Sequence, residues 1–375
     1  MTNVATMAWK MFGWAKREVS KQWHNVLGLI FNMPVRNRIK KVRYVHLMFN
    51  DKFNSPFVSF LNKHFDKSQH LILCKRLFSD YAFPVAENVM EVKTFRHIGV
   101  GDNVRCVICH SLFDQELVDI LYDDGKLLRK AAWMIWGGDL YSAKRSVKDD
   151  YVRRHFAFVI TDTDGDDVEY RNRYSQEKKS IRAGYTFPVT WEMVLACSGS
   201  KYRHDDCVCV QINNSCDKST LEMIDTLSAF SKNNIKVRTI LSYGELKYRE
   251  EIIKKGKEKF GDKFVYQVAL MSPSQYSEWM SNVDVLVLNH NRQQGIGNSF
   301  LALALGAKLY IRSTVTTYKH FLSRGIMCYD SLKIAGMSFQ TFVMKDKDEV
   351  EKNKRLVKQF FDNEELARLW KPVFD

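Results

Sequence analysis

Residues 284–306 read DVLVLNHNRQQGIGNSFLALALG, which predicts a short apolar strand, a polar turn and a helix in direct succession. Where a strand passes through a glycine-bearing turn into a helix, backbone N–H groups are left without partners and the helix dipole makes that end electropositive. Such an end is a ready site for phosphate. Gly295 and Gly297 have no Cβ to hinder a bulky anion. The turn therefore predicts a diphosphate site.

Ile296 lies between the two glycines, and residues with polar side chains flank this stretch in the sequence. The donors near the turn are Arg292, Gln293, Gln294, Asn298 and Ser299. The alternative is an ordinary strand–turn–helix junction whose glycines serve only tight packing.

The alternation of strand and helix continues outward in both directions. Toward the N-terminus, strands are predicted at Arg43–Met48, Leu71–Cys74, Arg105–Cys109, Ala131–Ile135 and Phe156–Ile160, with helices such as Pro56–Phe65 and Phe113–Leu121. The later strands are Cys207–Ile212, Val237–Leu241, Lys263–Gln267, Asp284–Leu288 and Lys308–Ile311, separated by helices at Ser219–Lys232, Glu245–Phe260, Pro273–Ser281 and Asn298–Leu305. This βαβ rhythm predicts parallel sheets covered by helices on both faces.

A chain of 375 residues is long for one hydrophobic core, since single cores rarely grow beyond ~250–300 residues. We expect two doubly wound, Rossmann-like α/β domains, residues 43–190 and 191–345, whose strand C-termini face a shared cleft. The joint is placed in the polar stretch Thr186–Asp206. Residues 346–375 are predicted to form C-terminal helices with a break at Asp362 and Asn363.

Residues 1–42 are predicted to be a basic amphipathic helical segment. Residues 1–43 hold nine Lys and Arg and one acidic residue, a net +8 of the chain's +14. Such a helix suits an anionic membrane surface, at about 1 kcal/mol for each cationic residue near it. A helix docked on the main body is the alternative. Nucleic acid is a poorer partner, because the charge lies at one end without a recognised binding motif. The apolar stripe comprises Trp9, Phe12, Val19, Trp23, Val26, Leu27 and Ile30, flanked by Lys10, Lys16, Arg17 and Lys21.

No run approaches the ~18 apolar residues of a spanning helix, and the N-terminus has no secretory-signal pattern. A cytoplasmic, peripheral protein is expected. Cys106-Val-Ile-Cys109-His110 matches the haem-attachment spacing, but it lies in an apolar strand that would direct alternate residues to opposite sides. Haem and zinc are therefore poor interpretations, and the eight cysteines are expected to be reduced core thiols.

Two further loops follow predicted strands. Trp136-Gly-Gly-Asp139-Leu-Tyr141 would put the Asp139 carboxylate at the cleft, where it can orient or deprotonate a sugar hydroxyl. A tight turn capped by Asp139 is the alternative. Asn213–Ser219 opens a helix and is a second candidate anion or nucleotide contact, with a simple N-cap by Asp217 or Ser219 as the alternative.

Two other candidates are His110, at the end of its strand, and the acidic cluster Asp162–Asp167. His110 faces either the cleft or the packed interior. The cluster resembles a metal-binding DxD motif, but an exposed acidic turn that caps a helix explains it better, and the spacing of a calcium loop fails at Arg173.

Together these loops resemble the TDP-N-acetylfucosamine:lipid II N-acetylfucosaminyltransferases (4-acetamido-4,6-dideoxy-D-galactose transferases) of enterobacterial common antigen synthesis. The resemblance covers roughly residues 43–330, and residues 1–42 look like an additional segment. The family's arginine-glutamine-glutamine-glycine-isoleucine-glycine motif is matched in full by Arg292–Gly297. Asp51 corresponds to a first-strand aspartate of the family. The other matches are Trp136, Gly137, Asp139, Leu140 and Tyr141, followed by Asn214, Ser215 and Asp217.

The resemblance implies a GT-B fold, a TDP-linked deoxyamino sugar as donor, a polyprenyl-diphosphate saccharide as acceptor, no cofactor and no obligatory metal. It places the protein peripherally on the cytoplasmic face of the bacterial inner membrane. Asp139, with His110 and Asp51 as alternatives, would be the catalytic residue. The donor would be bound by Asn214, Ser215, Asp217, Lys218, Arg292, Gln293, Gln294, Gly295, Ile296, Gly297 and Asn298.

The chain departs from this family at two places. Thr163-Asp164-Gly165-Asp166 stands where the family has threonine-arginine-glycine-aspartate, and Asn213 replaces a glycine. Donor or acceptor can therefore differ, as in an O-antigen enzyme. Two alternatives stay open: a metal-dependent glycosyltransferase that uses Asp162 and Asp164, and a non-catalytic nucleotide-sugar-binding assembly protein.

Overall fold

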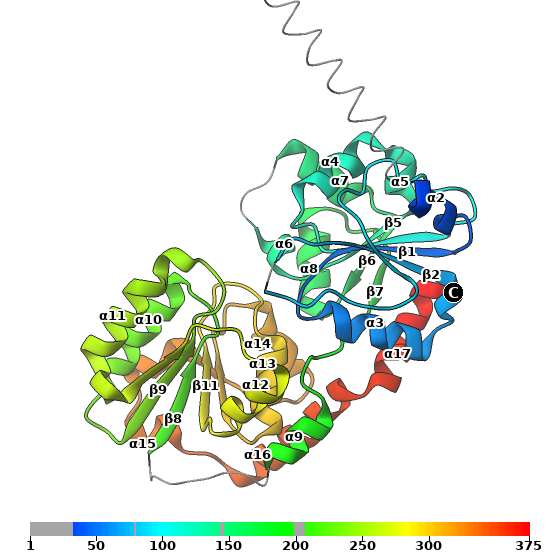
Figure 1. Cartoon of the computed structure of the whole chain (residues 1–375). Helices are drawn as coiled ribbons and strands as arrows, with labels where there is room; N and C mark the ends of the chain where they lie inside the picture. The colour runs from blue at the N-terminus through cyan, green and yellow to red at the C-terminus, as the bar shows by residue number, and fades with distance from the viewer. Residues whose placement is uncertain (1–32, 79, 143–145, 199–206) are drawn as a thin grey trace, which may run out of the picture. The chain divides into compact units, whose positions relative to one another are not determined.

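The computed structural model describes residues 33–78, 80–142, 146–198 and 207–375. The described chain contains a seven-stranded and a six-stranded sheet, each with helices on both faces (Figure 1). The two doubly wound α/β sheets that the sequence predicts are therefore present.

The first sheet has the strand order β3-β2-β1-β4-β5-β6-β7. Strand β1 pairs in parallel with β2 on one side and with β4 on the other. The winding reverses between β1 and β4, and the crevice outside the carboxyl ends at such a switch point is where ligands bind in open α/β sheets. The strands are β1 (Tyr44–Phe49), β2 (His70–Lys75), β3 (Val89–Glu91), β4 (Cys106–His110), β5 (Ala131–Met134), β6 (Phe158–Thr161) and β7 (Ser180–Arg182).

The second sheet repeats this plan in the order β10-β9-β8-β11-β12-β13, and all five pairings are parallel. Its switch point lies between β8 and β11, whose Val210 and Val285 are register partners. The strands are β8 (Val208–Ile212), β9 (Ile235–Ile240), β10 (Phe264–Gln267), β11 (Val285–Leu288), β12 (Lys308–Ile311) and β13 (Tyr329–Asp330).

The helices fill the connections between these strands, as a βαβ pattern requires. In the first half they are α2 (Met33–Ile39), α3 (Asn54–His64), α4 (Gln115–Asp123), α5 (Gly125–Lys130), α6 (Gly138–Tyr141), α7 (Val147–His155), α8 (Asp164–Arg173) and α9 (Trp191–Ser198). In the second half they are α10 (Lys218–Leu227), α11 (Arg249–Phe260), α12 (Pro273–Ser281), α13 (Ile296–Ala304), α14 (Thr316–Ser323), α15 (Phe339–Val343), α16 (Lys347–Lys358) and α17 (Asn363–Phe374).

Strand β11 shows why a buried parallel strand is apolar throughout. Leu286 and Leu288 pack into one core with Phe300 of α13, whereas Val285 and Val287 pack into the core on the opposite face. Successive side chains of a strand point to opposite faces, and here both faces carry a helical layer. The DVLVL run thus contributes to two cores at once.

The predicted order of strands and helices is confirmed, and the bounds of α12 and β12 agree residue for residue. Three strands were missed: β3, β7 and β13. Each has only two or three residues and lies at the edge of its sheet. An edge strand pairs on one side only, so it needs no continuous apolar run that periodicity could detect.

Contact density divides the described chain into two compact units. The first holds residues up to Met134 and residues 146–159, and the second holds 135–142 and the described residues from Ile160 onward. Strand β6 spans the boundary. The predicted joint includes α9, with 199–206 outside the described residues, and most of the predicted basic N-terminal segment, residues 1–32, also lies outside them.

The C-terminal tail forms the two predicted helices, and Asp362 caps the second, α17. The buried Trp370 indole donates to the carbonyl of Gly184 (2.8 Å), which ties α17 to the chain just after β7. Among the described residues, no helix has the length and apolarity needed to cross a membrane. All eight cysteines are free and six are buried, as expected for core thiols.

Candidate functional site

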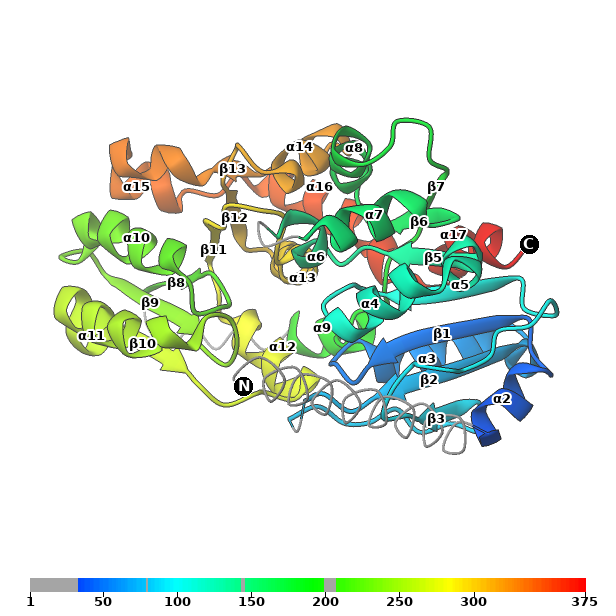
Figure 2. The same ribbon diagram turned by 90° about the horizontal axis from the view of Figure 1, so that it is seen from above.

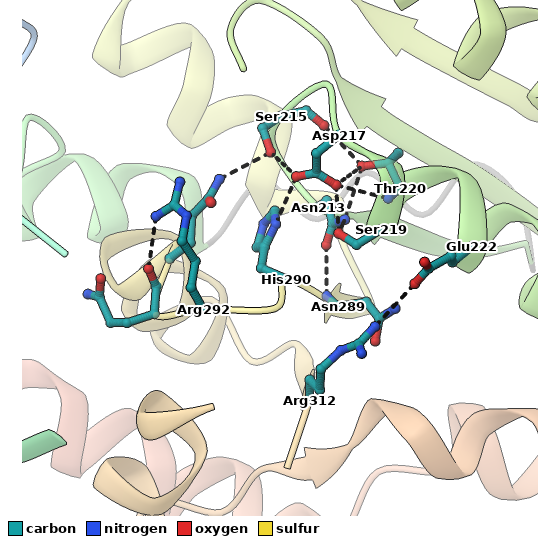
Figure 3. Close-up of polar contacts among 12 residues, drawn as sticks. Asn213, Ser215, Asp217, Ser219, Thr220, Glu222, Asn289, His290, Arg292 and Arg312 are labelled. Atoms are coloured by element: carbon teal, nitrogen blue, oxygen red, sulfur yellow. Dashed lines mark hydrogen bonds and ion pairs between the residues drawn. The ribbon is translucent and has the colours of Figure 1, made fainter. Parts of the chain in front are cut away.

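The two polar loops predicted to bind the donor follow β8 and β11, which are neighbours in the second sheet. Because the carboxyl ends of parallel strands lie at the same edge, the loops meet (Figure 3). Gln294 Nε2 donates to Ser215 Oγ (3.1 Å), and His290 Nδ1 lies 3.0 Å from Asp217 Oδ2. The structure thus brings both motifs together at the switch point.

Asn213, which replaces the family's glycine, has a φ of +36°. Asparagine tolerates this left-handed region better than most residues because its short amide can bond locally. Its Nδ2 donates to Ser219 Oγ (2.9 Å) and Thr220 Oγ1 (3.0 Å), and its Oδ1 accepts from the backbone N–H of Asn289 (2.8 Å). The departure from the family therefore preserves the backbone conformation and links the two loops.

Asp217 is the N-cap of α10 and accepts from the backbone N–H of Thr220 (3.0 Å). Its two oxygens also accept from Ser215 Oγ (2.7 Å) and Ser219 Oγ (2.6 Å). Burial acts to raise the pKa of Asp217, but hydrogen bonds and the adjacent His290 outweigh it and hold the pKa far below its usual value. Asp217 is therefore the N-cap that the sequence left as the alternative, and its donor contact stays a prediction.

Asn214 and Ser215 are also buried within the loop. Asn214 Nδ2 donates to Tyr276 Oη (2.9 Å), which in turn donates to Asn298 Oδ1 (2.8 Å). Ser215 is bonded to Asp217 and Gln294. Asn214, Ser215 and Asn298 therefore hold the two loops in place, a structural role that their polarity alone did not distinguish from ligand binding.

The N-terminus of α13 is the other predicted anion site. Gly295, its N-cap, has a φ of +77°, and no side chain accepts a hydrogen bond from the first turn. A Cβ on Gly295 would lie 3.0 Å from Leu288, and one on Gly297 would lie 2.9 Å from Phe187. The glycines thus serve backbone conformation and packing, and the approach of an anion to them stays a prediction. Ile296 is a core residue of the same helix.

Arg292 lies on the turn that enters α13, and its side chain is exposed although protein atoms crowd it. Its Nη1 donates to the carbonyl of Gln293 (3.1 Å). Desolvation lowers the pKa of Arg292, while Tyr243, Asp217 and Asp139 act to raise it, and the guanidinium stays charged. Lys218, the first residue of α10, is exposed as well. Arg292, Lys218 and the half-buried Gln294 are the predicted donor-binding side chains still open to a ligand.

Asp139 is almost fully buried, at 2% exposure, and its Oδ1 accepts from the backbone N–H of Trp136 (3.0 Å). The bond joins Asp139, inside α6, to a residue before the helix, so Asp139 is not the N-cap of α6; that position is Gly137, without a side-chain cap. The loop belongs to the second unit, like Arg292. Gly137 has a φ of +78°, and a Cβ there would lie 2.0 Å from Gln293 Oε1. The loop therefore packs directly against the turn that precedes α13.

His110 is the last residue of β4, and Asp51 follows β1, at the switch point of the first sheet. His110 is 1% exposed, and its Nε2 lies 2.9 Å from Nδ1 of the equally buried His46. It is a core histidine, and a direct role as catalytic base is not supported by its position. Asp51 is half-buried and accepts from the backbone N–H of Phe53 (3.1 Å), and burial raises its pKa.

The acidic cluster begins α8, as expected, and is exposed at Asp164 but not at Asp166. Thr163 caps α8, and Asp166 is 1% exposed. Asp164 lies 3.4 Å from Arg182 Nη1 and 3.5 Å from His320 Nδ1, and burial lowers the pKa of His320 to about 4, so the charged partner is Arg182. In the described parts of the chain, no group of three or more His, Cys, Asp or Glu is arranged to hold a metal ion.

Sequence reasoning missed two residues at this edge, His290 and Tyr243. His290 is the second residue after β11, and Tyr243 lies in the loop after β9. The carbonyl of Tyr243 accepts from the N–H of Cys216 (2.8 Å), which ties that loop to the loop after β8. Their position just after predicted strands was the available signal.

A family model described as 4-alpha-L-fucosyltransferase glycosyl transferase group 56 matches residues 90–330. No curated protein matches the sequence. Among solved structures, sucrose-phosphate synthase from Thermosynechococcus elongatus is similar at a TM-score of 0.63 and 11% identity, covering 88% of this chain and 99% of that one. Anabaena HepE in complex with UDP and glucose gives 0.62 and 11%, with coverages of 88% and 99%.

The trehalose-6-phosphate synthase of Burkholderia multivorans gives a TM-score of 0.61 at 8% identity, covering 89% of this chain and 97% of that one. At these identities the likeness concerns the fold, which is GT-B. Together with the family match it makes the protein a glycosyltransferase. This favours an enzyme over the non-catalytic assembly protein.

Proposed function

The chain belongs to glycosyl transferase group 56, the 4-alpha-L-fucosyltransferase family, and on that premise we propose that it transfers a deoxyamino sugar of the N-acetylfucosamine type. The donor is a TDP-linked sugar, and the acceptor is a polyprenyl-diphosphate-linked saccharide of enterobacterial common antigen or O-antigen synthesis. These substrates are supported by the three motif resemblances, at Trp136–Tyr141, Asn214–Asp217 and Arg292–Gly297.

The observation that carries the proposal is the α13 N-terminus without a side-chain cap, beside Arg292 at the β8–β11 switch point. A nucleoside diphosphate gains negative charge as the glycosidic bond to it breaks. Backbone amides and a guanidinium aimed at that charge stabilise the transition state more than the ground state. Anabaena HepE, whose structure holds UDP and glucose, supports a nucleotide-sugar donor.

The acceptor hydroxyl must lose a proton as it attacks the sugar. Asp139 is our first candidate for the base, because its loop packs against the turn that carries Arg292. Asp51 is the second, since burial raises its pKa toward the range useful for proton transfer. His110 is not retained, because burial lowers its pKa to about 3 and makes its imidazole a poor proton acceptor.

We further propose that the protein acts peripherally at the cytoplasmic face of the inner membrane, through the basic segment 1–42. The support is its charge and its apolar stripe at helical spacing. Co-sedimentation with anionic vesicles should be lost when Lys10, Lys16 and Lys21 are changed to Glu in the full chain. Equal co-sedimentation of this variant would contradict membrane contact through this segment.

A thermal-shift screen of the full chain across nucleotide sugars tests the donor. TDP-linked deoxyamino sugars should raise the melting temperature more than UDP- or GDP-sugars, followed by transfer to a lipid-linked saccharide. Selective stabilisation by a different nucleotide would overturn the TDP assignment. Loss of activity in excess chelator would favour the alternative metal-dependent mechanism.

A further inference from the structure

Helix α6, which carries Asp139, follows strand β5 of the first unit, yet it belongs to the second unit together with α13 and α14. It has only four residues. So short a helix has little stability of its own, since nucleation costs more than one turn returns. Its position must therefore be set by contacts with its neighbours.

The main polar contact is made by Tyr141, the last residue of α6. Tyr141 Oη donates to Asp166 Oδ1 of α8 (2.9 Å) and lies 2.9 Å from Thr316 Oγ1, at the first residue of α14. One hydroxyl thus joins three helices. All three residues lie in the second unit.

The elements around α6 are closely packed. A Cβ on Gly165 would lie 2.3 Å from the side chain of Thr316, so the first turns of α8 and α14 are in close contact, and the two helices lie side by side in Figure 2. Arg173 Nη1 also donates to the carbonyl of Leu140 (3.1 Å). On the other side of α6, Gly137 is in contact with Gln293.

The charges around Asp166 make this contact sensitive to protons. The pKa of Asp166 is raised to about 7 by burial, with help from Asp162 and Asp139, although hydrogen bonds from Thr163 and Tyr141 act to lower it. Arg182 faces the same group from β7. Near neutral pH the carboxyl therefore exchanges a proton while it is bonded to Tyr141.

We propose that Tyr141, Asp166 and Thr316 are positioning residues, a clamp that fixes the Asp139 loop to α14 and so to the part of the enzyme that holds the donor. This proposal rests on the proposed function in one respect, which is that Asp139 acts on the reacting sugars. Tyr141 itself touches no substrate. Its hydroxyl decides where the short helix α6 stands relative to the turn at Gln293.

The test is Tyr141→Phe, which keeps the ring and removes the hydroxyl. Backbone amides 138–142 should exchange hydrogen at least roughly tenfold faster, because opening of the loop loses its main restraint. The kcat should fall roughly tenfold or more with an unchanged donor Kd, since a small misplacement of a reacting group slows the step strongly. Thr316→Val should behave like Tyr141→Phe, whereas Thr316→Ser should restore the wild-type values.

Tyr310→Phe is the matched control. Tyr310 is fully buried in the same unit, and its hydroxyl donates to the carbonyl of Phe342 (2.9 Å). This variant should lower the melting temperature and leave both kcat and the exchange of amides 138–142 unchanged. If Tyr141→Phe behaves like this control, the clamp is wrong and the hydroxyl only adds stability.

Asp166→Asn provides a second readout, the pH profile. The amide cannot titrate but can still accept from Tyr141, so kcat should persist and its dependence on pH between about 6 and 8 should flatten. An unaltered profile would overturn the role of Asp166. If the wild type transfers no sugar between the tested substrates, the proposed substrates are wrong. Hydrogen exchange in Tyr141→Phe needs no substrate, so it still shows whether the hydroxyl holds the loop.

Discussion

The two switch points of this molecule have the same topology and different chemistry. Between β1 and β4 the first sheet places His46 and His110, two buried histidines in contact with each other. Between β8 and β11 the second sheet places a network of hydroxyl, amide and carboxylate groups, and the exposed Arg292 lies on the turn beside it (Figure 3).

The same winding of strands thus supports an apolar interior in one case and an anion site in the other. A fold supplies the position of a site, and the side chains decide what the site can do. On the proposed function the donor diphosphate binds at the second sheet, and the half-buried Asp51 is the acidic candidate at the first.

The largest expected difference between the two regions is their response to pH. Burial lowers the pKa of His70 to about 4 and that of His110 to about 3, and it holds that of His46 well below its ordinary value. These groups are neutral when folded and take up protons on unfolding below about pH 6.5. The first unit should therefore lose stability as the pH falls from about 6.5 toward 4, by about 1 kcal/mol per pH unit for each group.

Asp166 of the second unit changes stability with pH in the opposite direction. Its pKa is raised to about 7 when folded, so its contribution is greatest below about pH 4 and is lost as the pH rises through 7. Hydrogen exchange measured in β1 and in α8 between pH 4.5 and 7.5, corrected for intrinsic rates, checks both signs. Parallel changes in the two regions would contradict the comparison.

Arg292→Ala should have the next largest effect. Losing a charged donor to a diphosphate weakens binding by about 2–3 kcal/mol, roughly 30- to 150-fold in donor Kd. Calorimetry with the nucleotide sugar measures it. Arg368→Ala, an exposed arginine on α17 paired with Glu365, removes the same charge and should leave the donor Kd unchanged. Equal affinities of the two variants for the donor would show that the diphosphate does not bind at α13.

Gly137→Ala tests whether the Asp139 loop depends on its contact with the second switch point. It combines a φ of +78° with a Cβ that would overlap Gln293 Oε1. Gly261 has a φ of +57° and open space around it, so Gly261→Ala carries the backbone strain alone. We expect about 1 kcal/mol of destabilisation for Gly261→Ala and about 1–3 kcal/mol more for Gly137→Ala, by chemical denaturation.

Lys218→Ala should have the smallest effect. Lys218 is exposed at the start of α10, where Asp217 already caps the helix. A charge in high dielectric contributes about 0.2–1 kcal/mol, so the donor Kd should rise no more than roughly fivefold. A loss as large as that of Arg292→Ala would show that the phosphate lies at α10 and not at α13.

Much of the fold could be predicted from local patterns. The DVLVL run and the NRQQGIG turn identified β11 and the start of α13 because a strand buried on both faces is apolar throughout and a helix start needs a turn. The short edge strands β3, β7 and β13 gave no such pattern, since pairing on one side buries too little surface.

Within the site, residue type and order indicated which loops matter, but not which side chains are free. Asn214, Ser215 and Asp217 are polar residues after a strand, as a ligand-binding loop requires, and the structure bonds them to one another and to neighbouring loops. Residue type alone does not distinguish a polar side chain that is hydrogen-bonded within the protein from one that is available to a ligand.

The sequence by itself determined the two parallel sheets, the order of their elements and the two loops at the second switch point, because these follow from short-range periodicity and turn chemistry. Only the tertiary structure decided that His110 is buried, that Asp217 caps a helix, and that Tyr141 joins α6 to α8 and α14. Burial and hydrogen-bond partners depend on residues distant in the chain, such as Tyr141 and Thr316, which only folding brings together.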